Sequence, residues 1–148
     1  MKLSKTIQLL FIALSCFLLG FSFNNNIHPS NDSDDFVQFE ADTLLAQLYK
    51  TGELWLPFLK KETLLTGVYA IPAGGDDPQS PHTMDEVYYI LKGKAKFQAG
   101  EEKSEAHKGS IIYVKANVEH HFYDIDEDLE VLVFFSRKIL KEKEEEKK

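Results

Sequence analysis

A series of short β-forming segments, which begins near residue 63, is the feature that most constrains the fold of this chain. The segments are rich in Val, Ile, Tyr and Phe, and residues typical of turns separate them. The expected strands are residues 63–71, 86–91, 94–98, 111–114, 120–124 and 130–135. Short strands at close spacing favour an all-β sandwich or barrel. The sequence therefore predicts one all-β domain over residues 36–136, with a short helix at its N-terminal end.

Two of these segments lead to more specific expectations. Lys92–Gly93 is expected to form a tight turn that joins residues 86–91 and 94–98 as a hairpin. The stretch from Leu132 to Phe135 is apolar at successive positions, so both faces of this strand should be covered. A second sheet layer or the interface of a homodimer would cover the outward face.

A helix and an apolar segment are expected before the strands. Asp42 and Thr43 are suited to cap a helix over residues 44–49, and Gly52 is suited to end it. Leucines in this helix would form an apolar stripe that packs on the domain. Residues 54–59 are largely apolar and are expected to cover one end of the domain.

The N-terminal part of the chain resembles an export signal. Lys2 and Lys5 precede a mostly apolar run, so residues 1–23 are predicted to be a secretory signal peptide or an N-terminal membrane anchor. A lipoprotein attached through Cys16 is a third alternative. Residues 24–35 are rich in Asn, Ser and Asp and are predicted to form a flexible linker. We therefore expect an exported protein that is periplasmic, secreted or anchored outside the cytoplasm.

Charge and cysteine content exclude several classes of function. The formal net charge is -7 and the basic residues are scattered, which argues against a nucleic-acid partner. Cys16 is the only cysteine, so the chain can form neither an intramolecular disulfide nor a cysteine-based zinc cluster. Residues 137–148 mix both signs of charge and are predicted to form a solvated tail.

Three side chains form the candidate metal site. His82 and Glu86 are four residues apart, and side chains an even number of residues apart point to the same side of an extended strand. His120 follows a turn at Ala116–Asn117 and would add a second imidazole. Two imidazoles and one carboxylate form a facial triad with open positions, which suits non-heme Fe(II). We assign His82, Glu86 and His120 as the ligands of one divalent metal ion: Fe(II), Mn(II) or Zn(II).

Other polar and aromatic residues are expected outside this set. His121 should point away from His120 because adjacent residues of a strand face opposite sides. His107 should be exposed, and Asp85 should be solvated because it has the opposite parity to Glu86. The aromatic residues expected in the core are Tyr88, Tyr113, Phe122 and Phe134.

The first of the two histidine-containing stretches resembles a known family motif. His82, three residues, Glu86, six residues and Gly93 are similar to the second half of the first motif of the cupin superfamily. Ser80 stands where that motif has its first histidine. The usual four ligands of such a barrel are thereby reduced to three, and Gln79, Ser80, Asp85 or water would have to fill the fourth position.

The second stretch resembles the second cupin motif. Gly109, five residues, Lys115, one residue, Asn117, two residues and His120 have its spacing. Lys115 replaces a proline of the motif and Asn117 replaces a glycine, and Asn is well suited to a left-handed turn position. The resemblance covers residues 37–136 and implies a small single-domain cupin of the conserved-barrel type. The implied fold is a single double-stranded β-helix, or jelly-roll, barrel.

The resemblance implies a metal-binding protein with a small-molecule ligand or substrate. An Fe(II)-dependent dioxygenase is the leading interpretation, and an isomerase or hydrolase that uses Zn(II) or Mn(II) is an alternative. A non-catalytic ligand-binding barrel is the alternative from another class, because fold does not decide function. No further acid or base has a place in the motifs, which argues against general acid–base chemistry.

Overall fold

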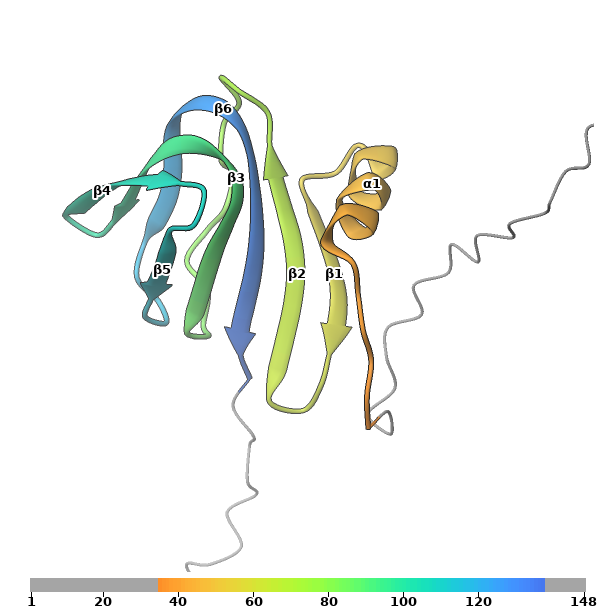
Figure 1. The fold of residues 1–148 in the computed structure, drawn as a ribbon. Helices are drawn as coiled ribbons and strands as arrows, with labels where there is room; N and C mark the ends of the chain where they lie inside the picture. The colour runs from red at the N-terminus through yellow and green to blue at the C-terminus, as the bar shows by residue number, and fades with distance from the viewer. Residues whose placement is uncertain (1–34, 138–148) are drawn as a thin grey trace, which may run out of the picture.

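One helix and six strands make up residues 35–137, the part of the chain that this computed structural model describes (Figure 1). The elements are α1 (Ala41–Thr51), β1 (Trp55–Lys60), β2 (Leu64–Ile71), β3 (Glu86–Ala99), β4 (Glu102–His107), β5 (Ile111–Val114) and β6 (His120–Ser136). They confirm the predicted all-β fold with a short N-terminal helix. The predicted signal or anchor segment at residues 1–23 lies outside the described residues. So do the linker, apart from residue 35, and the tail, apart from residue 137.

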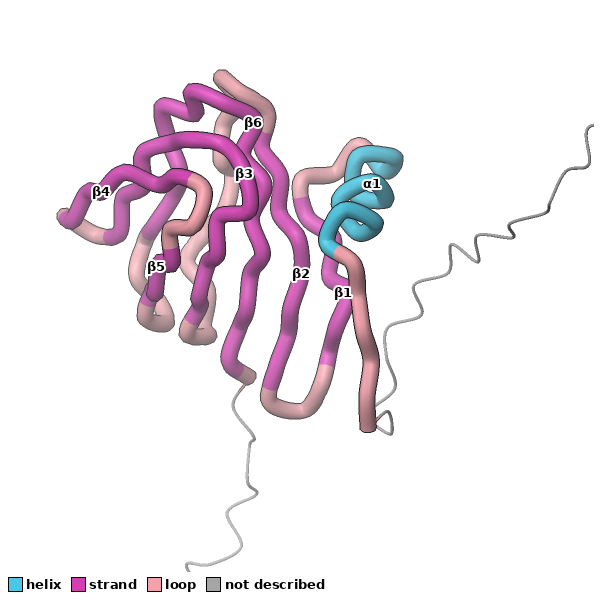
Figure 2. Tube along the Cα trace, viewed as in Figure 1, coloured by secondary structure: helices cyan, strands magenta, loops and turns pink. Residues whose placement is uncertain are grey.

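The strands form one antiparallel sheet that bends back on itself. Its order is β1-β2-β6-β3-β4, and β5 pairs with β3 beside this path. The long strands β3 and β6 pair with each other along two stretches, which are separated by register shifts between Ile90 and Lys96. The sheet curves along these two strands, with β4 and β5 on one side of the bend and β1 and β2 on the other (Figures 1 and 2).

The expected hairpin at Lys92–Gly93 is wrong, because the chain continues through this point as a single strand, β3. Gly93 has a φ of 92°, and a Cβ atom there would lie 2.3 Å from the carbonyl oxygen of Asp128 on β6. Only a glycine fits this conformation and this close approach. The gap expected between residues 124 and 130 is likewise absent, since β6 runs without interruption through Asp124, which has a φ of 46°.

Helix α1 covers part of the outer face of the sheet. It begins after Glu40 instead of after a cap formed by Asp42 and Thr43, and it ends at Gly52, which has a φ of 74°. Its buried leucines pack against the outward side chains of β1 and β2. They are Leu44, Leu45 and Leu48, as the sequence predicts. Residues 54–59, expected to cover one end of the domain, contain most of strand β1.

The interior of the bent sheet is filled by aromatic and branched side chains. Tyr88, Phe97 and Phe122 contact one another, with ring centroids 4.8–5.6 Å apart. The core positions expected for Tyr88 and Phe122 are thus confirmed. Tyr113 is 61% exposed, so its expected core position is wrong. Strand β4 was not predicted, because Ala106 is its only buried residue and most of its other side chains are charged and exposed.

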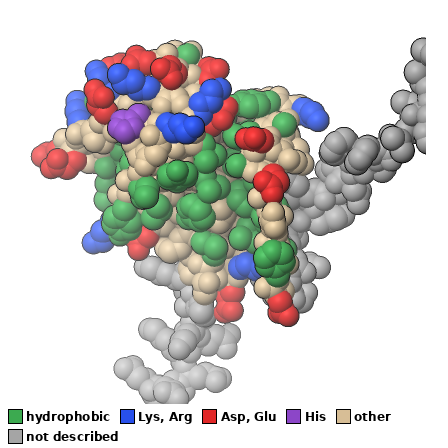
Figure 3. Space-filling model, viewed as in Figure 1, with side chains coloured by type: hydrophobic (Ala, Val, Ile, Leu, Met, Phe, Trp, Pro, Cys, Tyr) green, Lys and Arg blue, Asp and Glu red, His purple; other side chains and the backbone are tan. Residues whose placement is uncertain are grey.

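The outer face of β3, β5 and β6 carries an apolar patch beside α1. Tyr89, Ile111 and Tyr113 are exposed there. Three half-buried residues adjoin them: Val87 pairs with Tyr113, Leu132 pairs with Tyr89, and Phe134 pairs with Val87. We call these six residues the outer apolar face. Figure 3 shows hydrophobic side chains gathered in the middle of this view, below a band of charged residues.

The prediction that both faces of the Leu132–Phe135 stretch are covered holds for one face. Val133 and Phe135 are buried in the interior, whereas Leu132 and Phe134 point outward and stay half-buried. Within residues 35–137, no helix has the length and apolar character needed to cross a membrane.

Candidate metal centre

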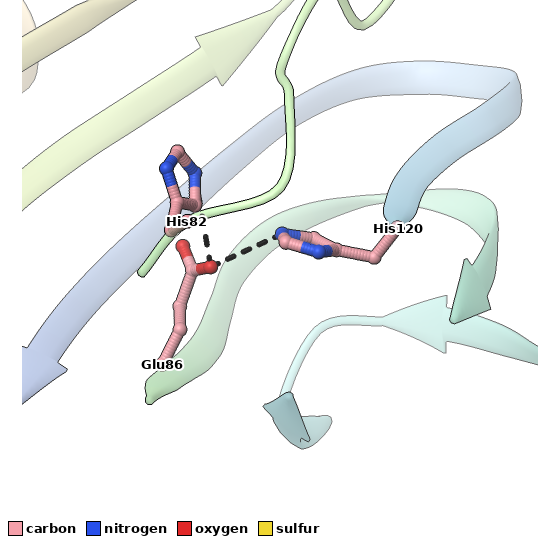
Figure 4. Close-up of side chains that lie close together, drawn as sticks. All are labelled: His82, Glu86 and His120. Atoms are coloured by element: carbon pink, nitrogen blue, oxygen red, sulfur yellow. Dashed lines mark ion pairs between the residues drawn. The ribbon is translucent and has the colours of Figure 1, made fainter. Parts of the chain in front are cut away.

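Three side chains from separate parts of the fold converge in the interior (Figure 4). His82 lies in the loop before β3, Glu86 is the first residue of β3, and His120 is the first residue of β6. One ligand atom from each residue lies within 4.8 Å of the others. Glu86 Oε2 is 3.1 Å from His120 Nε2 and 3.9 Å from His82 Nε2. The structure thus brings together the three residues that the sequence assigns to the metal site.

The three residues differ in their access to solvent. The side chains of Glu86 and His120 are each 2% exposed, whereas that of His82 is 31% exposed. A ligand would therefore approach the site from the side of His82. The rings of His82 and His120 lie 5.6 Å apart, which leaves space between them above the carboxylate.

The hydrogen bond of His120 fixes which of its ring nitrogens is free. His120 Nδ1 lies 2.7 Å from the carbonyl oxygen of Val118, and a carbonyl can only accept, so Nδ1 carries the hydrogen. Nε2 of the neutral ring then presents a lone pair towards Glu86 Oε2. Neither atom has a hydrogen-bond partner among the described residues, although both are fully buried. Two facing acceptors require a metal ion or a proton between them.

The pKa of His120 reflects these surroundings. Burial alone would lower the pKa of this imidazole, but the Glu86 carboxylate and the Val118 carbonyl oppose burial. Their combined effect is larger, so the pKa of His120 lies above its usual range. In the metal-free protein a proton is therefore bound more readily at this position than on a solvated histidine.

Asp77 organises the loop that carries His82. Its carboxylate accepts hydrogen bonds from the Tyr69 hydroxyl at 2.6 Å, from Gln79 Nε2 at 2.6 Å and from the Phe122 backbone N–H at 2.8 Å. Gln79 Oε1 in turn accepts a hydrogen bond from the Tyr88 hydroxyl at 2.8 Å. The loop is thereby attached to β2, β3 and β6, all of which border the site.

The sequence gives only a partial signal for the role of Asp77. An Asp followed by Pro favours a turn in which the side chain accepts a backbone hydrogen bond. Such a bond is present at 3.3 Å, from the backbone N–H of Gln79. The contacts of Asp77 with Tyr69 and Phe122 depend on the bend of the sheet and have no local signal.

None of the residues considered for the fourth ligand position is free to occupy it. Ser80 is exposed. Gln79 lines the cavity, but its amide is bound to Asp77 and Tyr88. Asp85 is not simply solvated as expected, because its carboxylate accepts a hydrogen bond from the Ala116 backbone N–H at 2.9 Å.

The two remaining histidines of the described chain lie away from the site. His121 is half-buried on the opposite side of β6 from His120, and its ring contacts Tyr123 with centroids 5.6 Å apart. His107 is exposed at the end of β4. Both positions agree with the sequence-based expectation.

A cavity of about 440 Å³ is lined by two of the three residues, His82 and Glu86. Its apolar wall comprises Leu54, Trp55, Leu65, Met84, Val133 and Phe135. The hydroxyls of Tyr69 and Tyr88 also border it. Burial and nearby carboxylates raise the pKa of both tyrosines well above the usual range, so they remain protonated donors. The sequence predicts Tyr88 as a core residue and Val133 and Phe135 as strand residues, and it gives no signal that they line a cavity.

Comparisons with known proteins agree with this architecture. A family model described as "Cupin domain" matches residues 67–135. An uncharacterized protein of Streptomyces coelicolor is 42% identical over 98 residues, which cover 66% of this chain and 93% of that protein.

Two solved structures have a similar fold. An RmlC-like cupin family protein with a double-stranded β-helix fold, from Methanocaldococcus jannaschii, matches with a TM-score of 0.56 and 18% identity. This match covers 71% of the present chain and 92% of that chain. A Bacillus halodurans protein matches with a TM-score of 0.58 and 15% identity over 75% of this chain and 87% of that one. At such identities the two structures are evidence for a shared fold alone.

Proposed function

The chain belongs to the family of cupin domains, and from this premise we propose that it binds one divalent first-row metal ion. The ligands are His82, Glu86 and His120, and the adjoining cavity receives a small organic molecule next to the ion. Two imidazoles and one carboxylate suit Fe(II), Mn(II) and Zn(II) alike.

The unpartnered pair Glu86 Oε2 and His120 Nε2 is the observation that carries this proposal. The two atoms are buried, lie 3.1 Å apart and have no hydrogen-bond partner among the described residues. Protein interiors rarely leave polar atoms in this state, because desolvation without a partner is unfavourable. A proton on His120 Nε2 would satisfy this pair alone, whereas a divalent cation would satisfy both atoms and also engage His82.

The surrounding residues have defined parts in such a site. Glu86 would contribute the negative charge, and the hydrogen bond from His120 to Val118 would hold the imidazole in the tautomer that binds metal. His82 is the most exposed of the three and would complete the site where the cavity opens. When bound, the ion would supply Lewis-acid or redox chemistry at the positions that the protein leaves open.

For the type of reaction we propose oxidation by an Fe(II)-dependent dioxygenase in preference to hydrolysis or isomerisation. The two tyrosines of the wall are already engaged: Tyr69 with Asp77, and Tyr88 with Gln79. Neither tyrosine is free to act as a general acid or base. The same observation also supports a barrel that binds its ligand without turnover. Oxygen uptake by the Fe(II)-loaded protein in the presence of a bound ligand would separate the two functions.

Metal analysis of the purified full chain tests the central proposal. Wild type should bind close to one Zn(II) or Fe(II) per chain after dialysis against a weak chelator. His82→Ala and His120→Ala should each lose most of this metal, and Glu86→Gln should weaken binding while leaving the circular dichroism spectrum unchanged. His121→Ala and His107→Ala are matched controls that should retain it. A wild type that takes up no stoichiometric metal, or ligand variants that bind as well as the controls, would contradict the proposal.

A further inference from the structure

We infer that the ligand held beside the metal is an uncharged, largely apolar, planar molecule that binds the protein through a single polar end. This inference rests on the proposed metal function and adds the chemical class of the ligand. It depends on three features of the cavity: the pairing of its polar groups, the charges along its wall, and the position of Trp55.

Three polar side chains of the wall, Tyr69, Tyr88 and Gln79, already donate hydrogen bonds within the protein. Tyr69 donates its hydroxyl hydrogen to Asp77, and Tyr88 donates to Gln79. The amide nitrogen of Gln79 donates to Asp77 as well. A ligand group that needed hydrogen bonds from these residues would have to break bonds that already exist. Glu86 lines the cavity and has a buried carboxylate oxygen without a hydrogen-bond partner among the described residues, so recognition of a polar group is concentrated at the proposed metal site.

The charges around the cavity disfavour an anionic ligand. No cavity-lining residue within residues 35–137 is Lys or Arg. Glu53, an exposed residue, adds a second carboxylate to that of Glu86. One divalent ion beside Glu86 would leave a single positive charge at the coordinating end, but no cation for a carboxylate or phosphate at the far end of the ligand.

Trp55 provides a flat apolar surface at a fixed position. A Cβ atom at Gly67 would lie 2.1 Å from the indole ring, so the indole occupies the space above this glycine. The indole contacts the ring of Phe135 edge-to-face at 5.9 Å, and Phe135 contacts His82 at 4.9 Å. A continuous row of rings therefore leads from Trp55 to a metal ligand. A planar molecule can pack along this row while its donor atom faces the metal.

The size of the cavity is consistent with one small molecule. Its volume of about 440 Å³ lies near the lower end of the range for small-molecule sites, ~300–1,000 Å³. The inferred ligand thus combines one coordinating end, such as a phenol or an enol oxygen, with an uncharged ring.

A matched pair of probes tests the charge preference. Methyl 3,4-dihydroxybenzoate and 3,4-dihydroxybenzoate share the same coordinating end and differ at the far end in charge. Calorimetric titration of the Zn(II)-loaded full chain should show that the ester binds about tenfold more tightly than the acid. Zn(II) is chosen because it has no redox chemistry with these probes. Glu53→Lys should reduce this preference by strengthening the binding of the acid.

Variants of the aromatic row test the packing. Trp55→Ala should lower the affinity for the ester about fivefold and leave the affinity for Zn(II) unchanged. Trp55→Phe should keep most of the ester affinity, which guards against a general loss of structure. Equal binding of the two probes, tighter binding of the acid, or an unchanged ester affinity in Trp55→Ala would overturn the inference and leave the metal function intact. A wild-type chain that binds no Zn(II) would overturn the proposed function itself.

Discussion

At the scale of single residues, the proposed metal ion would compete with a proton for the space between Glu86 and His120. The pKa of His120 is raised in the metal-free protein, mainly because the Glu86 carboxylate and the Val118 carbonyl outweigh the effect of burial. Protonated His120 therefore stabilises the metal-free fold at low pH, and this contribution is lost as the pH rises through the folded-state pKa. Metal binding has the opposite dependence, because the imidazole must be neutral to coordinate.

This competition predicts how Zn(II) should change thermal stability with pH. Free Zn(II) at a hundred times its Kd should stabilise the chain by about 2.7 kcal/mol where His120 is neutral. The increase in melting temperature on adding Zn(II) should be clear near pH ~8 and small near pH ~5, on either side of the ordinary imidazole range. Differential scanning calorimetry measures it. His120→Ala should remove the increase at both pH values, and an increase that is larger at low pH would contradict the assignment.

At the scale of elements, the Asp77 loop shows how a residue that contacts no metal can position a ligand. Asp77→Asn replaces one acceptor oxygen by an NH₂ group, which then faces two donors: the Tyr69 hydroxyl and the Gln79 backbone N–H at one oxygen, or Gln79 Nε2 and the Phe122 backbone N–H at the other. We expect the free energy of unfolding to fall by about 2–3 kcal/mol, the amount expected when hydrogen bonds to a charged group are lost. Zn(II) affinity should fall in parallel because the loop carries His82.

The neighbouring Asp76 supplies the control for this prediction. It is exposed, so Asp76→Asn should change stability by less than about 0.5 kcal/mol and leave Zn(II) affinity unchanged. Urea unfolding and a Zn(II) titration on each variant give the two quantities. Equal behaviour of the Asp76 and Asp77 variants would mean that the loop is not held by Asp77.

The continuous path of β3 depends on Gly93. Gly93→Ala would place a Cβ atom 2.3 Å from the Asp128 carbonyl oxygen, at a φ of 92° that alanine rarely adopts. We expect a loss of more than about 3 kcal/mol in unfolding free energy. Gly100 also has a positive φ, 57°, but no atom lies within 4 Å of a Cβ placed there. Gly100→Ala should therefore lower the unfolding free energy by only about 1 kcal/mol. Chemical denaturation measures both values. Equal losses of unfolding free energy in the two variants would argue against the close approach of Gly93 to Asp128.

The elements also show where sequence reasoning succeeds. The positions of β2 and β5 were predicted closely, because β-branched and aromatic residues mark them. The proximity of His82 and Glu86 was predicted from their spacing, although the chain bends at Thr83 and Met84 instead of running extended between them. The register that brings His120 to them was implied by resemblance to a known motif, and not by any local pattern.

The errors have physical reasons as well. Gly93 favours a tight turn in a local reading, but its positive φ here serves a bend within β3 that only the long partner β6 stabilises. Strand β4 lacks an apolar pattern because it lies at the edge of the sheet and buries only Ala106. Asp77 was missed because its partners, Tyr69 and Phe122, are distant in sequence and become neighbours only when the sheet bends.

At the scale of the whole molecule, the outer apolar face is the surface that favours a homodimer. Tyr89, Ile111 and Tyr113 are 39%, 73% and 61% exposed on adjacent strands. None of the six residues of the face is charged, so a second copy of this acidic chain can pack there without like-charge repulsion at the centre. A two-fold axis through the outer apolar face would place this face of one copy against the same face of the other copy.

We therefore predict a homodimer that Ile111→Glu converts to a monomer. Ile111 is largely exposed, so the substitution should not affect folding. Light scattering after size exclusion gives the mass of wild type and variant. Phe36→Glu is the control, because Phe36 is 80% exposed elsewhere and its replacement should leave the dimer intact. A monomeric wild type, or a dimer that survives Ile111→Glu, would contradict the prediction.

Export of the protein also remains a prediction at this scale. It rests on Lys2, Lys5 and the apolar run within residues 1–23. Fractionation of cells that express the full chain with a C-terminal tag should place most of it outside the cytoplasm. Incorporation of labelled fatty acid at Cys16 would distinguish a lipoprotein from a cleaved or anchored form. Full-length protein found mainly in the cytosol would refute export.

The single tryptophan has one more consequence. Trp55 is the only tryptophan in the chain, and its half-buried indole forms part of the cavity wall. Light that excites indole selectively therefore reports on one place in the molecule. A molecule that enters the cavity displaces water from the ring, and the fluorescence emission should then move to shorter wavelength. The intrinsic fluorescence of Trp55 can therefore be used to screen unlabelled compounds for entry into the cavity.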